Sequence, residues 1–327
     1  MTLHPVVIFL GGLVVIVVGA ELLLRGATRI AAMLGIKPIL IGLTVVAVGT
    51  SAPELAVGVT AVLEGKGPLA VGNIAGTNIL NILFILGLSA AIRPLPLQLQ
   101  ITRLDVPVMI ASAVVLFVMA LDGVLSRTEG LILVAAALAY TAALIRLSRR
   151  ESAEMKQEFA EDFSPQALHV GRGLARGSWN AVLLVVGMGL TVLGADLMVG
   201  GAANLARMFG VSDAIIGLTI VAIGTSAPEL ATTVLATMKD DRDVAIGNLI
   251  GSSISNILVI LGVTCVAAPQ GVDVSREVLR IDLPLAAAVA IACWPVFRSD
   301  RMVSRREGVA FVTLYLAYLT TLAFLRA

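Results

Sequence analysis

The chain carries one sixteen-residue motif twice. Residues 41–56 read IGLTVVAVGTSAPELA and residues 216–231 read IGLTIVAIGTSAPELA, so 14 of 16 positions are identical at an offset of 175. A second block follows each copy at the same offset, with GNIAGTNILNILFILG at 72–87 and GNLIGSSISNILVILG at 247–262. Identity that recurs through both halves of a 327-residue chain indicates an internal duplication of the whole fold. The alternative is an old duplication that has no role in the present function of the protein.

The composition around these blocks is that of a membrane protein. Hydrophobic residues make up 58% of the chain and mean hydropathy is +0.99. Charged residues are 14%, against about 25% in soluble domains. This excludes a water-soluble enzyme, and a net charge of +1 excludes a nucleic-acid footprint. The two cysteines, Cys265 and Cys293, lie in apolar runs, where we expect small core residues and no disulfide framework.

Ten stretches are apolar enough, at about 20 residues each, to cross a bilayer. The sequence therefore predicts an all-α polytopic membrane protein with ten transmembrane helices, arranged as two five-helix repeats. The expected domains are 1–148, a linker at 149–178 and 179–327. The ten expected spans are 5–24, 38–63, 68–91, 106–122, 128–147, 179–200, 213–238, 244–268, 283–298 and 306–325.

An odd number of spans in each half has a topological consequence. Two five-span halves joined by a short linker must lie in opposite orientations, and such inverted repeats are typical of transporters, with the substrate site near the midplane. Most of the 23 Lys and Arg residues fall in the odd-numbered loops and the linker. Because basic loops stay cytoplasmic, we expect an integral cell-membrane protein with both termini outside and the linker inside.

The first block places charge and a helix break at the same depth. Pro53 and Pro228 interrupt otherwise apolar spans, because proline lacks an N–H and clashes with the preceding turn. Glu54 and Glu229 follow directly. A carboxylate at the bilayer centre costs about 2.5–3.5 kcal/mol on insertion scales, so such a residue marks a functional site or, as the alternative, a protonated or hydrogen-bonded kink residue.

A divalent cation would neutralise both glutamates where the halves meet. Ca²⁺ takes 6–8 oxygen ligands, including carboxylates and backbone carbonyls. Glu54 and Glu229, with carbonyls freed at Thr50 and Thr225 and with water, form a suitable oxygen set. A soft-metal site is excluded, because neither block has His or Cys nearby.

The second block contributes neutral oxygens. Thr77 and Asn81 are four residues apart and so share one helical face, and Ser252 and Asn256 repeat this spacing. Hydroxyls and amides suit a weakly bound monovalent cation or the support of other ligands, and interhelical hydrogen bonding is the alternative.

The remaining membrane charges favour structural roles. Asp105 and Asp282 precede Val-Pro and Leu-Pro and are expected to be helix N-caps. Ser126 with Glu129, and Ser304 with Glu307, have the spacing of a capping box. Glu21 and Asp196 match at the offset of 175, and an interfacial place is favoured over a gating role.

The paired motifs GTSAPE and GN-x-x-G-[TS] resemble the alpha repeats of the cation/calcium antiporter superfamily, and within it the prokaryotic sodium/calcium exchangers. The resemblance covers all ten expected spans. It implies alternating access in which Na⁺ or H⁺ is exchanged for Ca²⁺, with the first and sixth spans sliding against the others. It also implies Ca²⁺ ligands at Thr50, Glu54, Thr225 and Glu229, and Na⁺-site positions at Ala47, Ser51, Thr77, Ala222, Ser226 and Ser252.

The chain departs from many relatives at one pair of positions. Asn81 and Asn256 stand where relatives often carry one Asp, so only two fixed carboxylates face the ions. The resemblance then implies K⁺-independent exchange. The stretch 72–76 lacks the Glu of the proton-coupled branch, which favours Na⁺.

We therefore expect a Ca²⁺/Na⁺ antiporter in which Ca²⁺ and Na⁺ compete for the two glutamates. A Ca²⁺/H⁺ or other divalent cation antiporter, or a passive cation channel, are the alternatives. We expect no enzymatic activity, no cofactor, no nucleic-acid partner and no obligatory protein partner. The expected partners are the transported ions and the lipid bilayer.

Overall fold

The computed structural model describes residues 4–34, 36–162, 173–210, 222–299 and 301–326. Helices account for nearly all of these residues, as expected from the sequence. The first half contains α1 (Pro5–Leu34), α2 (Pro38–Ile41), η1 (Gly42–Val46), α3 (Ala47–Thr50), α4 (Ala52–Leu63), α5 (Gly67–Ile79), η2 (Leu80–Leu86), α6 (Gly87–Ile92), β1 (Leu95–Pro96), η3 (Ile101–Asp105), α7 (Val106–Met119), η4 (Ala120–Asp122), β2 (Val124–Leu125) and α8 (Arg127–Asp162).

The second half repeats this order as far as it is described. It contains α9 (Gly173–Met208), α11 (Ala222–Gly224), α12 (Ala227–Met238), α13 (Arg242–Ser255), η8 (Asn256–Leu261), α14 (Gly262–Ala267), β3 (Val272–Asp273), η9 (Val278–Asp282), α15 (Leu283–Ser299), β4 (Met302–Val303) and α16 (Arg305–Arg326). The elements η1, η2, η3, η8 and η9 are π-helical turns within longer helices. Such turns are rare and often mark functional sites.

Seven helical stretches of the described chain are long and apolar enough to cross a membrane, or eight if the bent pair Pro38–Thr50 and Ala52–Leu63 forms one span. The ten expected spans therefore stay a prediction. The expected span 306–325 is the helix α16, and the expected span 213–238 begins among residues outside the described ranges.

Several helices are longer than expected. α1 continues ten residues beyond the expected end at residue 24. α8 runs on to Asp162, into the expected linker, and α9 begins at Gly173. The linker sequence RRESAEMKQEFAED explains this continuation, because Ala, Glu, Lys, Gln, Met and Arg are strong helix formers.

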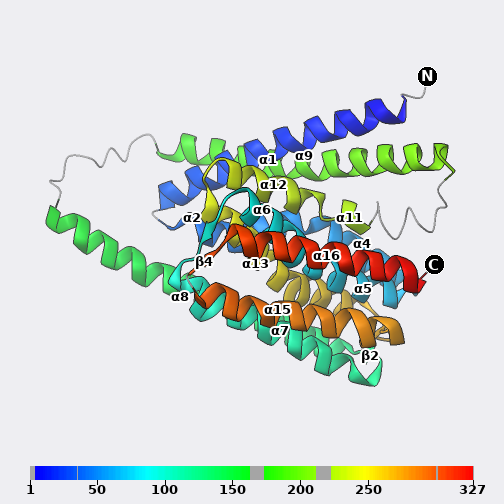
Figure 1. Cartoon of the computed structure of the whole chain (residues 1–327). Coiled ribbons are helices and arrows are strands. Elements are labelled where there is room, and N and C mark those ends of the chain that lie inside the picture. The colour runs from blue at the N-terminus through cyan, green and yellow to red at the C-terminus, as the bar shows by residue number, and fades with distance from the viewer. Residues whose placement is uncertain (1–3, 35, 163–172, 211–221, 300, 327) are drawn as a thin grey trace.

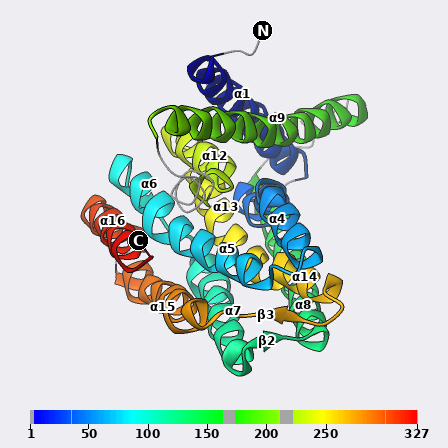
Figure 2. The ribbon, with the colours of Figure 1, turned by 90° about the vertical axis from the view of Figure 1, so that its right-hand side faces the viewer.

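The helices form a buried centre and an outer layer. The stretches from α5 to α6 and from α13 to α14 are the buried pair. In their most apolar 18-residue segments, 78% and 83% of the residues are buried, against 28% in α1. α1 and α9 lie side by side at one edge, α7, α8 and α15 lie on the opposite side of the centre, and α16 lies beside α6 on a flank (Figures 1 and 2). One core of aliphatic side chains from both halves joins the centre to this outer layer.

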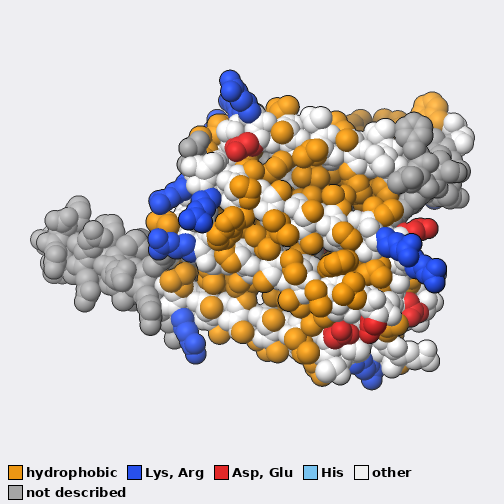
Figure 3. Space-filling model, turned by 60° about the horizontal axis from the view of Figure 1, so that its bottom comes forward, with side chains coloured by type: hydrophobic (Ala, Val, Ile, Leu, Met, Phe, Trp, Pro, Cys, Tyr) orange, Lys and Arg blue, Asp and Glu red, His pale blue; other side chains and the backbone are white. Residues whose placement is uncertain are grey.

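Counterpart segments of the two halves make the same contacts. β1 pairs with β4 and β2 pairs with β3, each as a two-residue antiparallel ladder. The β4 and β2 segments lie at opposite ends of the bundle (Figure 1). We call the end from which α8 extends the linker end. Lys and Arg side chains gather at the linker end, and apolar side chains cover the middle of the same face (Figure 3).

The capping boxes are confirmed in both halves. The Glu129 carboxylate accepts from the Ser126 N–H at 2.7 Å, and the Glu129 N–H donates to the Ser126 hydroxyl at 3.2 Å. Ser304 and Glu307 repeat this at 2.8 and 3.3 Å. These reciprocal bonds satisfy N–H groups that would otherwise lack partners at the helix start.

The expectation that Asp105 and Asp282 are capping residues is wrong. Asp105 has helical φ and ψ (−71°, −45°) and makes no capping bond. The π-helical turns η3 and η9 carry the helix through both aspartates, so neither stands at a helix start. Each instead accepts a hydrogen bond from a tyrosine hydroxyl, Tyr140 at 2.9 Å and Tyr318 at 3.0 Å.

Candidate ion-binding site

The two glutamates occupy equivalent places in broken helices. Pro38–Thr50 and Ala52–Leu63 meet at an angle of 43°, and Ser51 at the break has φ −83° and ψ 12°. Ser226 has nearly the same conformation, φ −90° and ψ 9°. Glu54 and Glu229 lie in the first turns of α4 and α12, and both are fully buried. A helix N-terminus is the favourable end for a carboxylate, because its free N–H groups and dipole are positive.

Each glutamate is held by a serine from the other half. The Ser51 hydroxyl donates to Glu229 Oε1 at 2.9 Å, and the Ser226 hydroxyl donates to Glu54 Oε1 at 3.3 Å. In one contact the first half supplies the serine, and in the other the second half does. The sequence-predicted residues Ser51, Glu54, Ser226 and Glu229 therefore converge at the interface between the repeats.

The second block joins the same cluster. The Ser226 hydroxyl lies 3.4 Å from the Thr77 hydroxyl, and the Ser252 hydroxyl donates to the Ala47 carbonyl at 3.4 Å. Thr77 and Ser252 are buried. Thr77 thus contacts the serine that holds Glu54, and Ser252 contacts the helix that leads to Ser51.

Thr50 is anchored by a residue that the sequence did not single out. Its hydroxyl donates to Asn248 Oδ1 at 3.2 Å. The Asn248 amide in turn donates to the hydroxyls of Thr232 and Thr233, at 3.1 Å each. In the sequence, Asn248 is the asparagine of the second Gly-Asn pair. Because asparagine also occurs in ordinary helix packing, this position alone did not indicate its role.

Thr225 and Ala222 are described less fully. Thr225 is half-buried in the turn between α11 and α12, and Ala222 begins α11.

The two predicted asparagines sit on π-helical turns but differ in their contacts. Asn256 begins η8, and its amide donates to Asn78 Oδ1 at 3.1 Å, while the Asn78 amide donates to the Ser253 carbonyl at 3.1 Å. Asn81 lies in η2 and is fully buried, and its side-chain nitrogen and oxygen have no hydrogen-bond partner within the described ranges. Asn78 is a second polar residue that sequence reasoning missed.

Four buried oxygens of the predicted site residues have no hydrogen-bond partner among the residues that the structure describes. They are Glu54 Oε2, Glu229 Oε2, Asn81 Oδ1 and Asn256 Oδ1. An unpaired buried polar group costs about 1–3 kcal/mol, and more when it is charged, so four together need an explanation. Carboxylate and amide oxygens with free lone pairs are the ligands that a hard cation takes.

Within the described ranges, no group of three or more His, Cys, Asp or Glu residues is placed to hold a metal. A cation at this cluster would therefore have to complete its shell with hydroxyl, amide and carbonyl oxygens. This donor set suits Ca²⁺ and Na⁺ and is unsuited to metals that prefer nitrogen or sulfur.

Glu21 lies away from this cluster, in an ionic group at the end of α12. It forms ion pairs with Arg25, at 2.5 Å, and with Lys239. Nearby, outside the membrane-spanning helices, burial raises the pKa of Asp241, with the Lys239 charge acting in the opposite direction. The interfacial place expected for Glu21 stays a prediction.

Comparison with known proteins identifies the family. The family described as "Sodium/calcium exchanger protein" matches residues 4–146 and 179–324. The chain belongs to the sodium/calcium exchanger family. It is thus an integral membrane protein of a transporter family, as the motifs predicted.

Relatives in the exchanger family match almost the entire chain. "Putative antiporter CaxA" of Alkalimonas amylolytica is 33% identical, over 94% of this chain and 95% of the relative. "Sodium/calcium exchanger MaX1" of Methanosarcina acetivorans is 31% identical over 97% and 98%. Solved structures of the sodium-calcium exchanger NCX_Mj superpose with a TM-score of 0.83 at 26% identity, covering 98% of this chain and 99% of that one. The family and the fold support cation antiport.

Proposed function

We propose that this family member exchanges Ca²⁺ for Na⁺ across the cell membrane by alternating access. The observation that carries the proposal is the reciprocal pair of contacts, Ser51 to Glu229 and Ser226 to Glu54. The second carboxylate oxygen of each glutamate has no partner among the residues that the structure describes. Ten spans in two inverted repeats would place this pair at the midplane, which is where such transporters bind their substrates.

Competition for the two carboxylates would couple the two fluxes. Ca²⁺ as substrate brings two positive charges to Glu54 and Glu229, and takes further oxygens from Thr50, Thr225 and water. Na⁺ ions would use the same carboxylates, with the neutral oxygens of Ala47, Ser51, Thr77, Ala222, Ser226 and Ser252 around them and Asn81 and Asn256 in support. Since one set of carboxylates cannot serve both cations at once, binding of one expels the other, and no chemical step is needed.

The deciding experiment is uptake of radiolabelled Ca²⁺ into proteoliposomes preloaded with Na⁺, beside K⁺-loaded vesicles and vesicles with only a pH gradient. We expect uptake to require internal Na⁺. Glu54→Gln and Glu229→Gln should each abolish it, because glutamine keeps the shape and the acceptor oxygen but removes the charge. Glu64→Gln is the matched control, because Glu64 is an exposed carboxylate that pairs with Lys66 at 2.8 Å.

Two results would contradict the proposal. Uptake driven by the pH gradient in the absence of Na⁺ would replace sodium with proton coupling. Wild-type uptake by Glu54→Gln would remove the glutamate pair from the transport site.

A further inference from the structure

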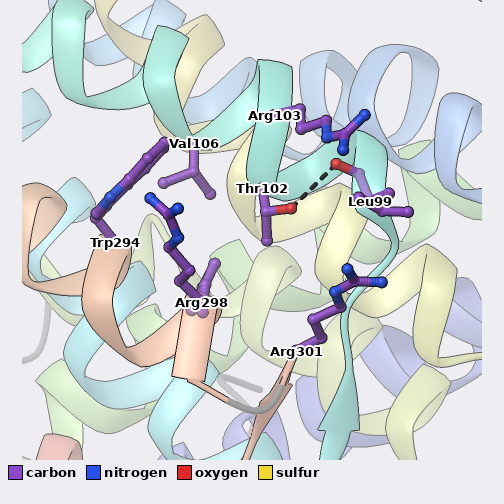
Figure 4. A pocket seen from close by; sticks show the side chains of 8 residues that line it. Leu99, Thr102, Arg103, Val106, Trp294, Arg298 and Arg301 are labelled. Atoms are coloured by element: carbon purple, nitrogen blue, oxygen red, sulfur yellow. Dashed lines mark hydrogen bonds between the residues drawn. The ribbon is translucent and has the colours of Figure 1, made fainter.

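A second site lies at the linker end, outside the ion cluster. A pocket of about 350 Å³ opens between the start of the α7 segment and the end of α15. Three arginines line it, namely Arg103, Arg298 and Arg301, together with Thr102, Val106 and Trp294. Figure 4 shows Arg298 reaching between Trp294 and Thr102, and Arg103 and Arg301 on either side of Leu99.

The three guanidinium groups have no carboxylate partner in the part of the chain that the structure describes. Among the described residues, no carboxylate lies within ion-pair distance of Arg103, Arg298 or Arg301, while Arg25, Arg93 and Arg242 all have such partners. Asp300 lies outside the described residues. Like charges that share one hollow repel each other, so an anion in the pocket would be stabilised.

Arg301 occupies a turn that disfavours an arginine. Its φ is +50°, in the left-handed region, and its counterpart in the first half is Gly123 at φ +88°. Both residues stand three positions before the serine of a capping box, Ser304 and Ser126. Glycine adopts this conformation without cost and arginine does not. Backbone strain of this kind at a non-glycine residue points to a role for its side chain.

The opposite end of the molecule lacks this arrangement. Arg103 has a basic counterpart, Arg280, but the positions that correspond to Arg298, namely Ala120 and Leu121, are apolar. Basic residues that only orient the protein in the membrane need neither a pocket nor an arginine at a turn that glycine fits. Arg298 and Arg301 therefore have no basic counterpart in the first half.

We propose that this pocket binds the phosphate group of an anionic phospholipid in the leaflet on the linker side. Guanidinium groups match phosphate oxygens with paired hydrogen bonds. Val106 and Trp294 give the pocket an apolar wall for the glycerol and acyl part, and tryptophan is enriched at the membrane interface. Basic pockets between transmembrane helices are sites of this kind.

The test measures lipid binding without transport, so it is independent of the exchange proposed above. In a Trp179→Phe background Trp294 is the remaining tryptophan of the two in the chain. Its fluorescence is titrated in detergent with brominated phosphatidylglycerol and, separately, with brominated phosphatidylcholine. We expect phosphatidylglycerol to quench at lower mole fraction. We expect Arg298→Gln/Arg301→Gly to weaken that binding about thirty-fold, taking about 1 kcal/mol per basic residue and 1.4 kcal/mol per tenfold.

The variants are chosen to separate binding from folding. Arg301→Gly installs the residue that the first half uses in the same turn, so it relieves strain. Arg276→Gln/Arg280→Gln removes the same charge at the other end and should keep the preference for phosphatidylglycerol. Equal quenching by both lipids, or an unchanged preference in Arg298→Gln/Arg301→Gly, would overturn the proposal. Displacement of the lipid by millimolar inorganic phosphate would assign the pocket to a soluble anion and would overturn it too.

Discussion

Asn248 connects the carboxylate cluster to the helices behind it. It accepts from Thr50 and donates to Thr232 and Thr233, so its amide group is fully engaged by three hydroxyls. Its counterpart in the first half, at an offset of 175, is Asn73, whose Nδ2 is buried without a partner. The reason lies in the sequence, because Val57 and Gly58 stand where the second half has the two threonines.

This difference predicts unequal effects of the same substitution. Asn248→Ala should lower the unfolding temperature by several degrees, since it removes three hydrogen bonds between buried side chains at about 0.5–1.5 kcal/mol each. Asn73→Ala, the matched control, should shift it little, because it removes an amide nitrogen that has no partner. Thermal unfolding in detergent measures both. Equal losses would show that the Asn248 network does not stabilise the protein.

The charged part of the site could be predicted from sequence, and its amide support could not. Glu54 and Glu229 stand out because an ionisable residue beside a proline in an apolar span is costly without a function. Asn248 and Asn78 give no such signal, because one buried amide in a helix has the same composition whether it packs helices or holds a ligand. Their roles depend on distances between the halves, which one sequence does not contain.

At the scale of helices, α1 and α9 meet through glycine. Gly12, Gly19 and Gly26 recur every seven residues on α1, and Gly187, Gly194 and Gly201 do so on α9, at the offset of 175. A Cβ at Gly19 would clash with the backbone of Thr191, and one at Gly194 with that of Ile16. Glycine therefore lets the two helices approach backbone to backbone. The composition showed abundant glycine, but the contact partner of each one needed the structure.

Adding one methyl group to this contact should separate the helices. We expect Gly19→Ala or Gly194→Ala to cost about 1–3 kcal/mol of stability through overpacking, and to lower Ca²⁺ uptake, because the resemblance implies that these two helices slide during transport. Gly11→Ala and Gly189→Ala are the controls, since nothing lies within 4 Å of a Cβ there. Unfolding temperature and uptake are measured together. If Gly19→Ala behaves like Gly11→Ala in both, the close contact does not constrain the helices.

Helix boundaries show where sequence patterns stop being informative. The capping boxes at Ser126 and Ser304 were predictable, because the bonds that define them are local. Asp105 and Asp282 have the spacing of caps as well, but their partners are Tyr140 and Tyr318, 35 and 36 residues away. A long-range tyrosine replaces the local bond, and π-helical turns remove the helix start that a cap requires.

At the scale of the molecule, charge separates the two ends of the bundle. Lys and Arg side chains gather at the linker end, and the acidic side chains on this face lie mainly at the other end (Figure 3). The basic group includes Arg93, Lys239 and Arg242, which also form ion pairs there. Basic residues near membrane-spanning helices keep their side cytoplasmic. The linker end should therefore face the cytoplasm.

This orientation predicts that both termini are extracytoplasmic. Alkaline phosphatase fused after Ala327 should be active and green fluorescent protein at the same place should be dark, because each reporter matures on only one side of the membrane. The same reporters inserted in the linker, 149–178, should give the opposite pattern, which checks that every fusion is inserted. With five spans in each half the termini share a side, so a fluorescent C-terminal fusion would contradict either the orientation or the ten-span count. A reporter at the N-terminus distinguishes the two explanations. If the orientation is wrong, both termini are cytoplasmic, and if the number of spans is odd, the two termini lie on opposite sides of the membrane.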